Sequence, residues 1–302
     1  MFRLPMTDTD FTQRFIFTDS DVRGELVCLE ESYAHVLAKH DYPEPVSTLL
    51  GELMAAAALL ISTVKFDGLL ILQARSSGAV PLLMVECSSE REMRAIARYE
   101  EAQISADASL PDMMPEGVLA ITIEPKQGQR YQGVVSLAGE NIASCLEGYF
   151  SSSEQLPSLF ILQADGRRAR GLLLQQLPAE VIVDEEARQA SWQHVTTLAQ
   201  TLTAEELLGL GNQAILYRLY HEENLELFAT QHLTFKCSCS QERSGNALQS
   251  LGREDVEKLL DEQDGCIEID CQFCNQKYKF NAQDVTKIFS QQSVNSQLST
   301  VH

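Results

Sequence analysis

The sequence predicts an α+β protein with a mixed or antiparallel sheet core, a helical connector and a small cysteine-rich C-terminal domain. Two observations lead to this prediction. Apolar runs of strand length, several of them paired across turn residues, are mixed with helical segments in residues 1–178. Five of the eight cysteines lie between positions 237 and 274. A length of 302 residues is enough for about two domains.

Two helices are expected near the N-terminus. The first covers residues 28–40, and the two prolines of Asp41–Pro45 end it. The second covers residues 46–64 and carries alanine and leucine on most of its faces, which is typical of a buried helix. Its most apolar part, Leu53–Val64, is shorter than the roughly 20 residues that a bilayer requires, so no membrane partner is expected.

Strands follow in pairs. Gly68–Arg75 and Val80–Cys87 flank the turn residues Ser76–Gly78 and predict a hairpin. A second hairpin, a helix over 140–150 and two further strands complete this domain before Pro178. Their expected ranges are Gly117–Glu124, Tyr131–Leu137, Leu159–Gln163 and Gly171–Gln175.

Residues 179–230 are expected to form a helical connector. Asp184–Leu202 has acidic residues in its first turn and places Trp192 on its apolar side. Thr203 and Glu206 have the spacing of a capping box that begins another helix. Because this region is too small for a large core of its own, it should pack on the domain of residues 1–178. Residues 231–290 then form the C-terminal domain, and the polar residues 291–302 are expected to fray.

Charge is concentrated in the first part of the chain. The formal net charge is −20, with 16 Lys/Arg against 33 Asp/Glu in residues 1–230 and 7 against 10 in residues 231–302. Such acidity disfavours a nucleic-acid partner. The first residues have no apolar stretch typical of a signal peptide, so a cytoplasmic protein is expected. Arg167, Arg168 and Arg170 are interpreted as a solvated turn.

Nothing in the sequence indicates an enzyme. The pair Gly209 and Gly211 lacks the third glycine and the preceding strand of a dinucleotide-binding loop. The phosphate-binding, zinc-protease and serine-hydrolase motifs are missing, and His35 and His40 have no nucleophile placed beside them by the sequence. We therefore expect no catalytic residues.

Four cysteines have the spacing of a metal site. Cys237-x-Cys239 is followed, after 31 residues, by Cys271-x-x-Cys274. Two close thiol pairs suit one tetrahedral Zn²⁺ per chain, because side chains at i and i+2 of an extended segment point the same way and a CxxC pair can wrap an ion. Residues 231–290 have few large apolar side chains, so the metal should supply much of their folding free energy.

The spacing alone leaves several functions open. They are a structural zinc ribbon in a scaffold or nucleic-acid adaptor, a regulatory thiol switch, and a thiol oxidoreductase using Cys271 and Cys274. The oxidoreductase is disfavoured because the CxxC pair does not begin a helix after a strand of a βαβ unit. Cys266 is interpreted as a bystander and His232 as a surface residue, whereas Cys28, Cys87 and Cys145 are expected to be buried small apolar residues.

The cysteine-rich segments FKCSCSQERSGNALQSLG and DGCIEIDCQFCNQKYKF resemble the zinc-binding end of the bacterial redox-regulated holdase chaperones, the heat shock protein 33 family. The likeness covers about residues 1–290. Arg170-Gly171 departs from paired glycines that are common in the family, and Cys266 is not among its four shared cysteines. Further blocks that match the family in the same order are Asp21–Gly24, Pro45–Glu52, Tyr131–Gly133, Tyr149–Pro157, Leu172–Pro178 and Arg218–Glu223.

The resemblance implies an ATP-independent chaperone that binds unfolding client proteins under oxidative or heat stress. It implies an inactive reduced form that holds one Zn²⁺ through Cys237, Cys239, Cys271 and Cys274. It also implies that oxidation forms the disulfides Cys237–Cys239 and Cys271–Cys274, releases the metal and yields an active homodimer. In such a family residues 1–178 would hold clients and the dimer interface, and residues 231–290 would be the redox switch.

Overall fold

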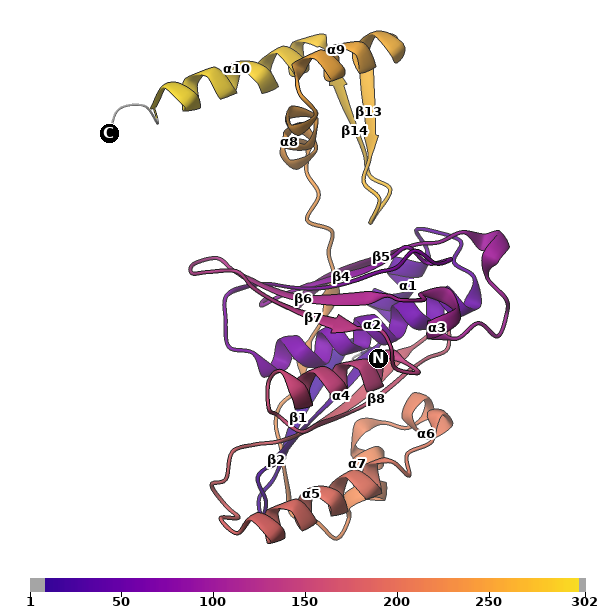
Figure 1. The fold of residues 1–302 in the computed structure, drawn as a ribbon, viewed down its shortest axis with the longest axis vertical. Coiled ribbons are helices and arrows are strands. Elements are labelled where there is room, and N and C mark those ends of the chain that lie inside the picture. The colour runs from indigo at the N-terminus through magenta and orange to yellow at the C-terminus, as the bar shows by residue number, and fades with distance from the viewer. Residues whose placement is uncertain (1–8, 299–302) are drawn as a thin grey trace, which may run out of the picture. The chain divides into compact units, whose positions relative to one another are not determined.

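A computed structural model describes residues 9–298 of the chain, with side chains described to residue 290. The chain divides between Lys236 and Cys237 into two compact units, which Figure 1 shows as a ribbon. The boundary lies six residues beyond the start expected for the C-terminal domain, because residues 231–236 pair with strands of the first unit.

One sheet of the first unit, called sheet A, has the strand order β10-β1-β2-β9-β8 within the described residues, and β11 also pairs with β1. Every pairing in this sheet is antiparallel. Its strands are β1 (Phe11–Phe17), β2 (Val22–Leu29), β8 (Ser158–Ala164), β9 (Ala169–Gln176), β10 (Leu225–Leu227) and β11 (Gln231–His232).

The second sheet, called sheet B, has the order β12-β5-β4-β3-β6-β7 in the described part of the chain. The short strand β12 pairs parallel to β5, and the other neighbours are antiparallel. Both predicted hairpins are therefore confirmed. The strands are β3 (Gly68–Arg75), β4 (Leu82–Ser88), β5 (Glu92–Arg98), β6 (Val118–Pro125), β7 (Tyr131–Ser136) and β12 (Thr234–Phe235).

Helix α2 (Glu44–Thr63) forms the centre of the first unit and buries residues on all of its faces. One apolar cluster joins it to side chains of both sheets, such as Val27 of sheet A and Leu72 of sheet B. The helix has 20 residues, so by length and composition it could cross a membrane, contrary to the shorter segment read from the sequence. Because 83% of its most apolar 18-residue stretch is buried inside the protein, α2 is a core helix, as expected from the sequence.

Short helices complete this part of the first unit, and the first of them begins later than the sequence predicts. The helix expected over 28–40 begins only at Glu31, because Cys28 and Leu29 belong to β2. Strands β1, β2 and β5 were not predicted. The remaining helices are α1 (Glu31–Leu37), the 3₁₀ turn η1 (Glu101–Gln103), α3 (Leu110–Met113) and α4 (Ile142–Ser152).

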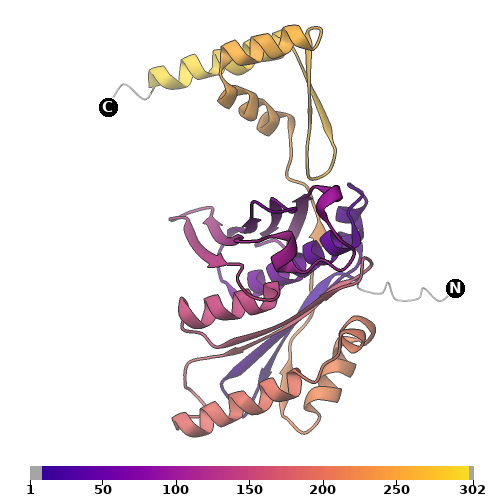
Figure 2. The ribbon, with the colours of Figure 1, turned by 45° about the vertical axis from the view of Figure 1, so that its right-hand side comes forward.

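The connector consists of α5 (Glu185–Ala199), α6 (Ala204–Gly209) and α7 (Asn212–Tyr220). These helices pack on the face of sheet A opposite to α2, as Figure 2 shows. Trp192 is partly buried against this cluster, and Thr203 and Glu206 form the predicted capping box. The prediction that this region packs on the preceding domain is confirmed. The apolar side chains of sheet A beneath it are Phe15, Phe17, Val22, Leu26, Leu172 and Leu174.

Arg170 of β9 and Arg168, which directly precedes this strand, bind the connector, contrary to the solvated turn predicted from the sequence. Arg170 is only 4% exposed and donates to the carbonyl of Leu210 and, over 2.7 Å, to Oδ1 of Asn212. Arg168 donates to the carbonyl of Leu208 and pairs with Glu30. The guanidinium groups thus satisfy carbonyls at the end of α6 that no helical amide reaches.

Asp21 holds the other end of the connector. Its buried carboxylate accepts the backbone N–H groups of Glu180, Val181 and Ile182 over 2.8–2.9 Å. Burial opposes ionisation, but these three amides outweigh it and keep the pKa of Asp21 below its usual value. Charge-assisted hydrogen bonds of this kind are stronger than neutral ones, so Asp21 fixes the path by which the chain enters α5.

We expect Asp21→Asn to lower the stability of the connector by about 1.5–3 kcal/mol, because the amide oxygen is a weaker acceptor and its NH₂ group faces backbone donors. Fluorescence of Trp192, the single tryptophan, would follow this loss in urea. Asp10→Asn is the matched control. Asp10 accepts three backbone N–H groups at the start of α1 rather than in the connector. The Asp10→Asn variant should therefore not release its connector at a lower urea concentration than the one that unfolds the rest of the first unit. Equal urea midpoints for Asp21→Asn and the parent protein would contradict the expectation.

The second unit contains a β-hairpin and helices around a small core. Strands β13 (Cys266–Asp270) and β14 (Lys277–Asn281) pair antiparallel, with α8 (Gln241–Leu251), α9 (Arg253–Glu262) and α10 (Ala282–Leu298). The tail expected to fray at 291–302 is helical to Leu298, and residues 299–302 lie outside the described residues. The buried apolar side chains of this core are Leu248, Val256, Ile267, Phe280, Val285 and Phe289.

Candidate metal centre

Two short segments of the second unit supply the four predicted ligands. Cys237 and Cys239 lie in the extended chain before α8, whose first turn is capped by the side chain of Ser240. Arg243 of that turn donates back to the carbonyl and hydroxyl oxygens of Ser238, over 3.1 and 2.6 Å, and so fixes the loop between the two thiols.

Cys271 and Cys274 lie in the turn that joins β13 to β14. The N–H groups of Cys274 and Asn275 both donate to the carbonyl of Cys271, over 3.3 and 2.7 Å, which folds the CxxC segment into a tight knuckle. Asn275 adopts a positive φ of 60°, a conformation that asparagine tolerates better than most residues. The N–H of Cys271 donates to the carbonyl of Gln276 and closes the turn.

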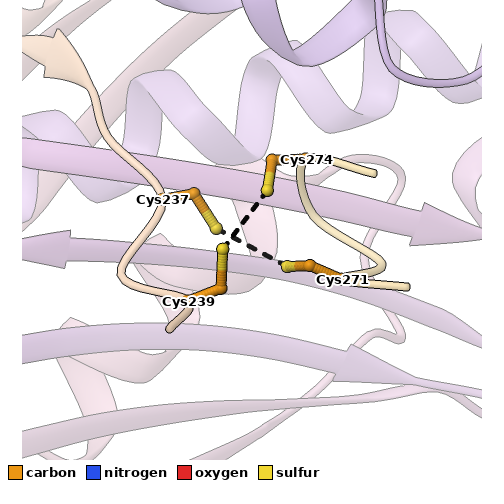
Figure 3. Close-up of side chains that lie close together, drawn as sticks. All are labelled: Cys237, Cys239, Cys271 and Cys274. Atoms are coloured by element: carbon orange, nitrogen blue, oxygen red, sulfur yellow. Dashed lines mark hydrogen bonds between the residues drawn. The ribbon is translucent and has the colours of Figure 1, made fainter. Parts of the chain in front are cut away.

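The four sulfur atoms converge, as Figure 3 shows, and all lie within 4.8 Å of one another. Sγ of Cys237 is 3.6 Å from Sγ of Cys271, and Sγ of Cys239 is 3.4 Å from Sγ of Cys274. A tetrahedral zinc site with Zn–S bonds of about 2.3 Å has sulfur–sulfur separations of about 3.8 Å. The observed spacing is too long for disulfides and fits four ligands around one ion. The sequence prediction that these four side chains meet is confirmed.

The surroundings of the sulfurs suit thiolates that are bound to a cation. The backbone N–H groups of Phe273 and Cys274 approach Cys271, and that of Gln276 approaches Cys274. Burial and the neighbouring thiols raise the pKa of both Cys271 and Cys274, because four negative charges so close together repel one another. A divalent ion reverses this effect by stabilising the thiolates.

Tyr278 of β14 is a residue of the site that the sequence analysis missed. Its hydroxyl donates to Sγ of Cys239 over 3.0 Å, and this bond, with the nearby thiols, raises the pKa of Tyr278 to about 12. A hydrogen bond from outside the ligand set orients a thiolate and lowers its charge density. Alternation along β14 is the signal that could have placed this side chain, but neither the strand nor its register was predicted.

The other cysteines are not members of the cluster. Cys28, Cys87 and Cys145 are buried, as predicted, and Cys266 is exposed at the start of β13. His232 lies on β11 of the first unit with its side chain exposed, as expected for a surface residue. All eight cysteines are thiols in this structure.

Comparisons with known proteins agree with one another. The model of the Hsp33 protein family matches residues 10–281. The chain is 66% identical to a 33 kDa chaperonin of Pseudomonas savastanoi pv. phaseolicola, over 98% of this chain and 99% of that protein. It is 65% identical to a 33 kDa chaperonin of Pseudomonas aeruginosa, over 94% and 96% of the two chains. The crystal structure of the Thermotoga maritima 33 kDa chaperonin has the same fold, with a TM-score of 0.79, 21% identity and coverage of 94% and 99%.

Proposed function

The chain belongs to the Hsp33 family of chaperones, and from that premise we propose that it is a redox-regulated, ATP-independent holdase of the cytoplasm. In this proposal the reduced protein holds one Zn²⁺ per chain and is inactive, and oxidation activates it toward unfolding client proteins. The oxidised form is a homodimer. Neither nucleic acid nor a membrane is a partner, and no residue has a catalytic role.

The convergence of four thiols in a unit with a small core is the observation that carries the proposal. A metal held by Cys237, Cys239, Cys271 and Cys274 would supply charge compensation and cross-link the two halves of this unit. Metal-bound cysteines are kept as thiolates, the form that oxidants attack. Because disulfide sulfur is a poor zinc ligand, oxidation removes the cross-link along with the metal.

We propose that the disulfides formed are Cys237–Cys239 and Cys271–Cys274, as the family likeness implies. In the reduced cluster the close sulfur contacts run across the two segments, from Cys237 to Cys271 and from Cys239 to Cys274. All four sulfurs lie within 4.8 Å of one another, so either pairing needs them to move to the disulfide bond length of about 2.05 Å as the cluster oxidises. Peptide mapping of the oxidised protein distinguishes the two patterns, and a Cys237–Cys271 bond would contradict this pairing.

The client surface in this proposal is the face of sheet A beneath the connector. Opening of residues 237–290 removes the folded anchor that follows the connector, and the connector then leaves its place. Six apolar side chains of sheet A, among them Phe15, Leu26 and Leu172, become available. Association with unfolding chains gains free energy from the apolar area removed from water. The strongly acidic composition of residues 1–230 keeps a protein with such an exposed face soluble.

Light scattering of a heat-denatured client tests the proposal. Protein pretreated with peroxide and mild heat is expected to suppress aggregation at near-stoichiometric amounts, and protein kept in dithiothreitol is not. Cys266→Ser is the matched control, since this exposed thiol lies in the same unit but outside the cluster, and the variant should switch normally.

Equal suppression of aggregation by the oxidised and the reduced protein would rule out the switch. Catalytic reduction of insulin disulfides would favour a thiol oxidoreductase, and zinc retained under oxidant would favour a structural adaptor.

A further inference from the structure

Cys28 lies in β2 beneath the connector and is not one of the four cysteines of the metal centre. Its partner across the strand pair is Arg170 of β9, and side chains of such a pair share one face of a sheet. Two residues earlier in β2, Leu26 belongs to the apolar cluster that the connector covers. Because side chains two residues apart in a strand point the same way, Cys28 faces the connector and is only 8% exposed.

Charged groups surround this thiol. Arg170 uses two nitrogens to bind the connector, and its buried Nε has no hydrogen-bond partner among the described residues. Arg168 also acts on Cys28, and Asp10 and Glu30 oppose the two arginines. Burial raises the pKa of the covered thiol, and Arg170 is the strongest influence in the opposite direction. The thiol is therefore protonated and inert while the connector is in place.

Departure of the connector changes both the bonding of the arginines and the burial of the thiol. Arg170 loses Leu210 and Asn212, and Arg168 loses the carbonyl of Leu208, so each arginine regains free donors. The cover that desolvates the thiol is lost as well. Arg168 keeps its ion pair with Glu30, whereas the guanidinium of Arg170 loses both of its connector partners. A thiol beside such a freed guanidinium is a typical reactive cysteine, and the positive charge attracts anionic reagents.

We propose that Cys28 is a cryptic modification site that forms a mixed disulfide with anionic low-molecular-weight disulfides once the connector is released. This inference rests on the proposed function, because it uses release of the connector as the event that uncovers the thiol. The site is separate from the four cysteines of the metal centre, and it responds to a different oxidant, a small disulfide rather than a peroxide.

The step is a thiol–disulfide exchange. The Cys28 thiolate attacks one sulfur of the small disulfide, a bond forms between that sulfur and Sγ, and the original sulfur–sulfur bond breaks. The departing thiolate carries away the electron pair and takes up the proton that Cys28 lost. Cys28 is thereby oxidised, and half of the reagent is reduced to a free thiol.

The adduct would keep the connector away from sheet A. The space above Cys28 is closed by the junction of α6 and α7, to which Arg170 is bound. A peptide-sized group cannot fit there without displacing that junction. The modified protein therefore stays open until a reductant removes the adduct, even if the metal centre has been restored.

The test uses the full-length, metal-loaded protein with oxidised glutathione as the reagent. Urea at a concentration where Trp192 fluorescence reports opening releases the connector without a peroxide, so labelling does not depend on the proposed switch. Trypsin yields one peptide, residues 24–39, with Cys28 as its only cysteine, and another, residues 76–91, with Cys87 only. The glutathionylated fraction of Cys28 is expected to rise at least tenfold on opening. Cys87, which is buried in the cluster around α2, should stay unmodified while that core is folded.

A second measurement follows the return of the connector. After dilution from urea, glutathionylated protein should recover its Trp192 signal only when dithiothreitol is added, whereas Cys28→Ser treated in the same way should recover at once.

Two results would overturn the inference and leave the proposed function intact. In the first, Cys28 is no more reactive than Cys87 in the opened protein. In the second, the modified protein recovers its Trp192 signal immediately. Faster labelling by cationic cystamine than by glutathione would overturn the role given to the arginines. Peroxide treatment that leaves Trp192 unchanged would instead count against the proposed function.

Discussion

Removal of the metal by a chelator is expected to unfold residues 237–290 and to release the connector, while the two sheets and α2 of the first unit stay folded. Among the described residues, the apolar core of the second unit has six buried side chains. The metal would join the segment of Cys237 and Cys239 to the turn of Cys271 and Cys274 by coordination bonds, which are stronger than the contacts between the thiols. Zinc binding in small modules contributes on the order of 10–16 kcal/mol at neutral pH, which is more than such a core supplies as net stability. Far-UV circular dichroism should lose part of its helical signal, and Trp192 fluorescence should report release of the connector.

Cys271→Ser gives the same result without a chelator, because three ligands remain and the serine hydroxyl is a poor substitute for a thiolate. We expect its zinc content to fall well below one per chain and residues 237–290 to be partly unfolded even in dithiothreitol. Cys266→Ser and Cys87→Ser should retain full zinc content, since neither thiol lies in the cluster. Parent-like zinc content together with parent-like circular dichroism for Cys271→Ser would contradict the metal's role in folding.

The elements that the sequence predicted well are those whose signal is local. Helix α2 combines a proline-marked start with apolar residues on every face, and the hairpin of β3 and β4 combines two apolar runs with turn residues. The four cysteines could be assigned to one site because two short spacings leave few other arrangements. In each case neighbouring residues contain the decisive information.

The elements that the sequence did not reveal depend on distant contacts. Strand β2 contains Gly24 and a charged Glu25, and only the structure shows that the ring of Phe15 occupies the space where a side chain at Gly24 would lie. Strand β5 is short and three of its seven residues are charged, and its Arg94 pairs with Glu86 of β4. Arg168 and Arg170 likewise bind carbonyls about forty residues later in the chain, which no local pattern could predict.

Glu52 is a further polar residue whose role is invisible in the sequence. It lies in the middle of α2, where two surface cavities of about 340 and 160 Å³ meet its side chain. The charged residues that line the larger cavity with it, Glu44, Asp107 and Glu140, are all acidic. Burial without a compensating cation raises the pKa of Glu52 to about 7.

We expect Glu52→Gln to stabilise the protein by up to about 3 kcal/mol at pH 8 and to have little effect at pH 5. The unfolded carboxyl group ionises near pH 4.5, whereas the folded one keeps its proton to about pH 7. The native state therefore binds the extra proton across this window, and stability falls as the pH rises through it. Glutamine has nearly the same shape and no charge, so it avoids that loss.

Urea unfolding at the two pH values measures the difference in free energy of unfolding between the variant and the parent protein. Any pH dependence of metal binding affects both proteins equally and cancels in this difference. Glu140→Gln at the rim is the control and should change stability by less than about 0.5 kcal/mol. A Glu52→Gln effect of the same size at both pH values would show that shape rather than ionisation governs this position.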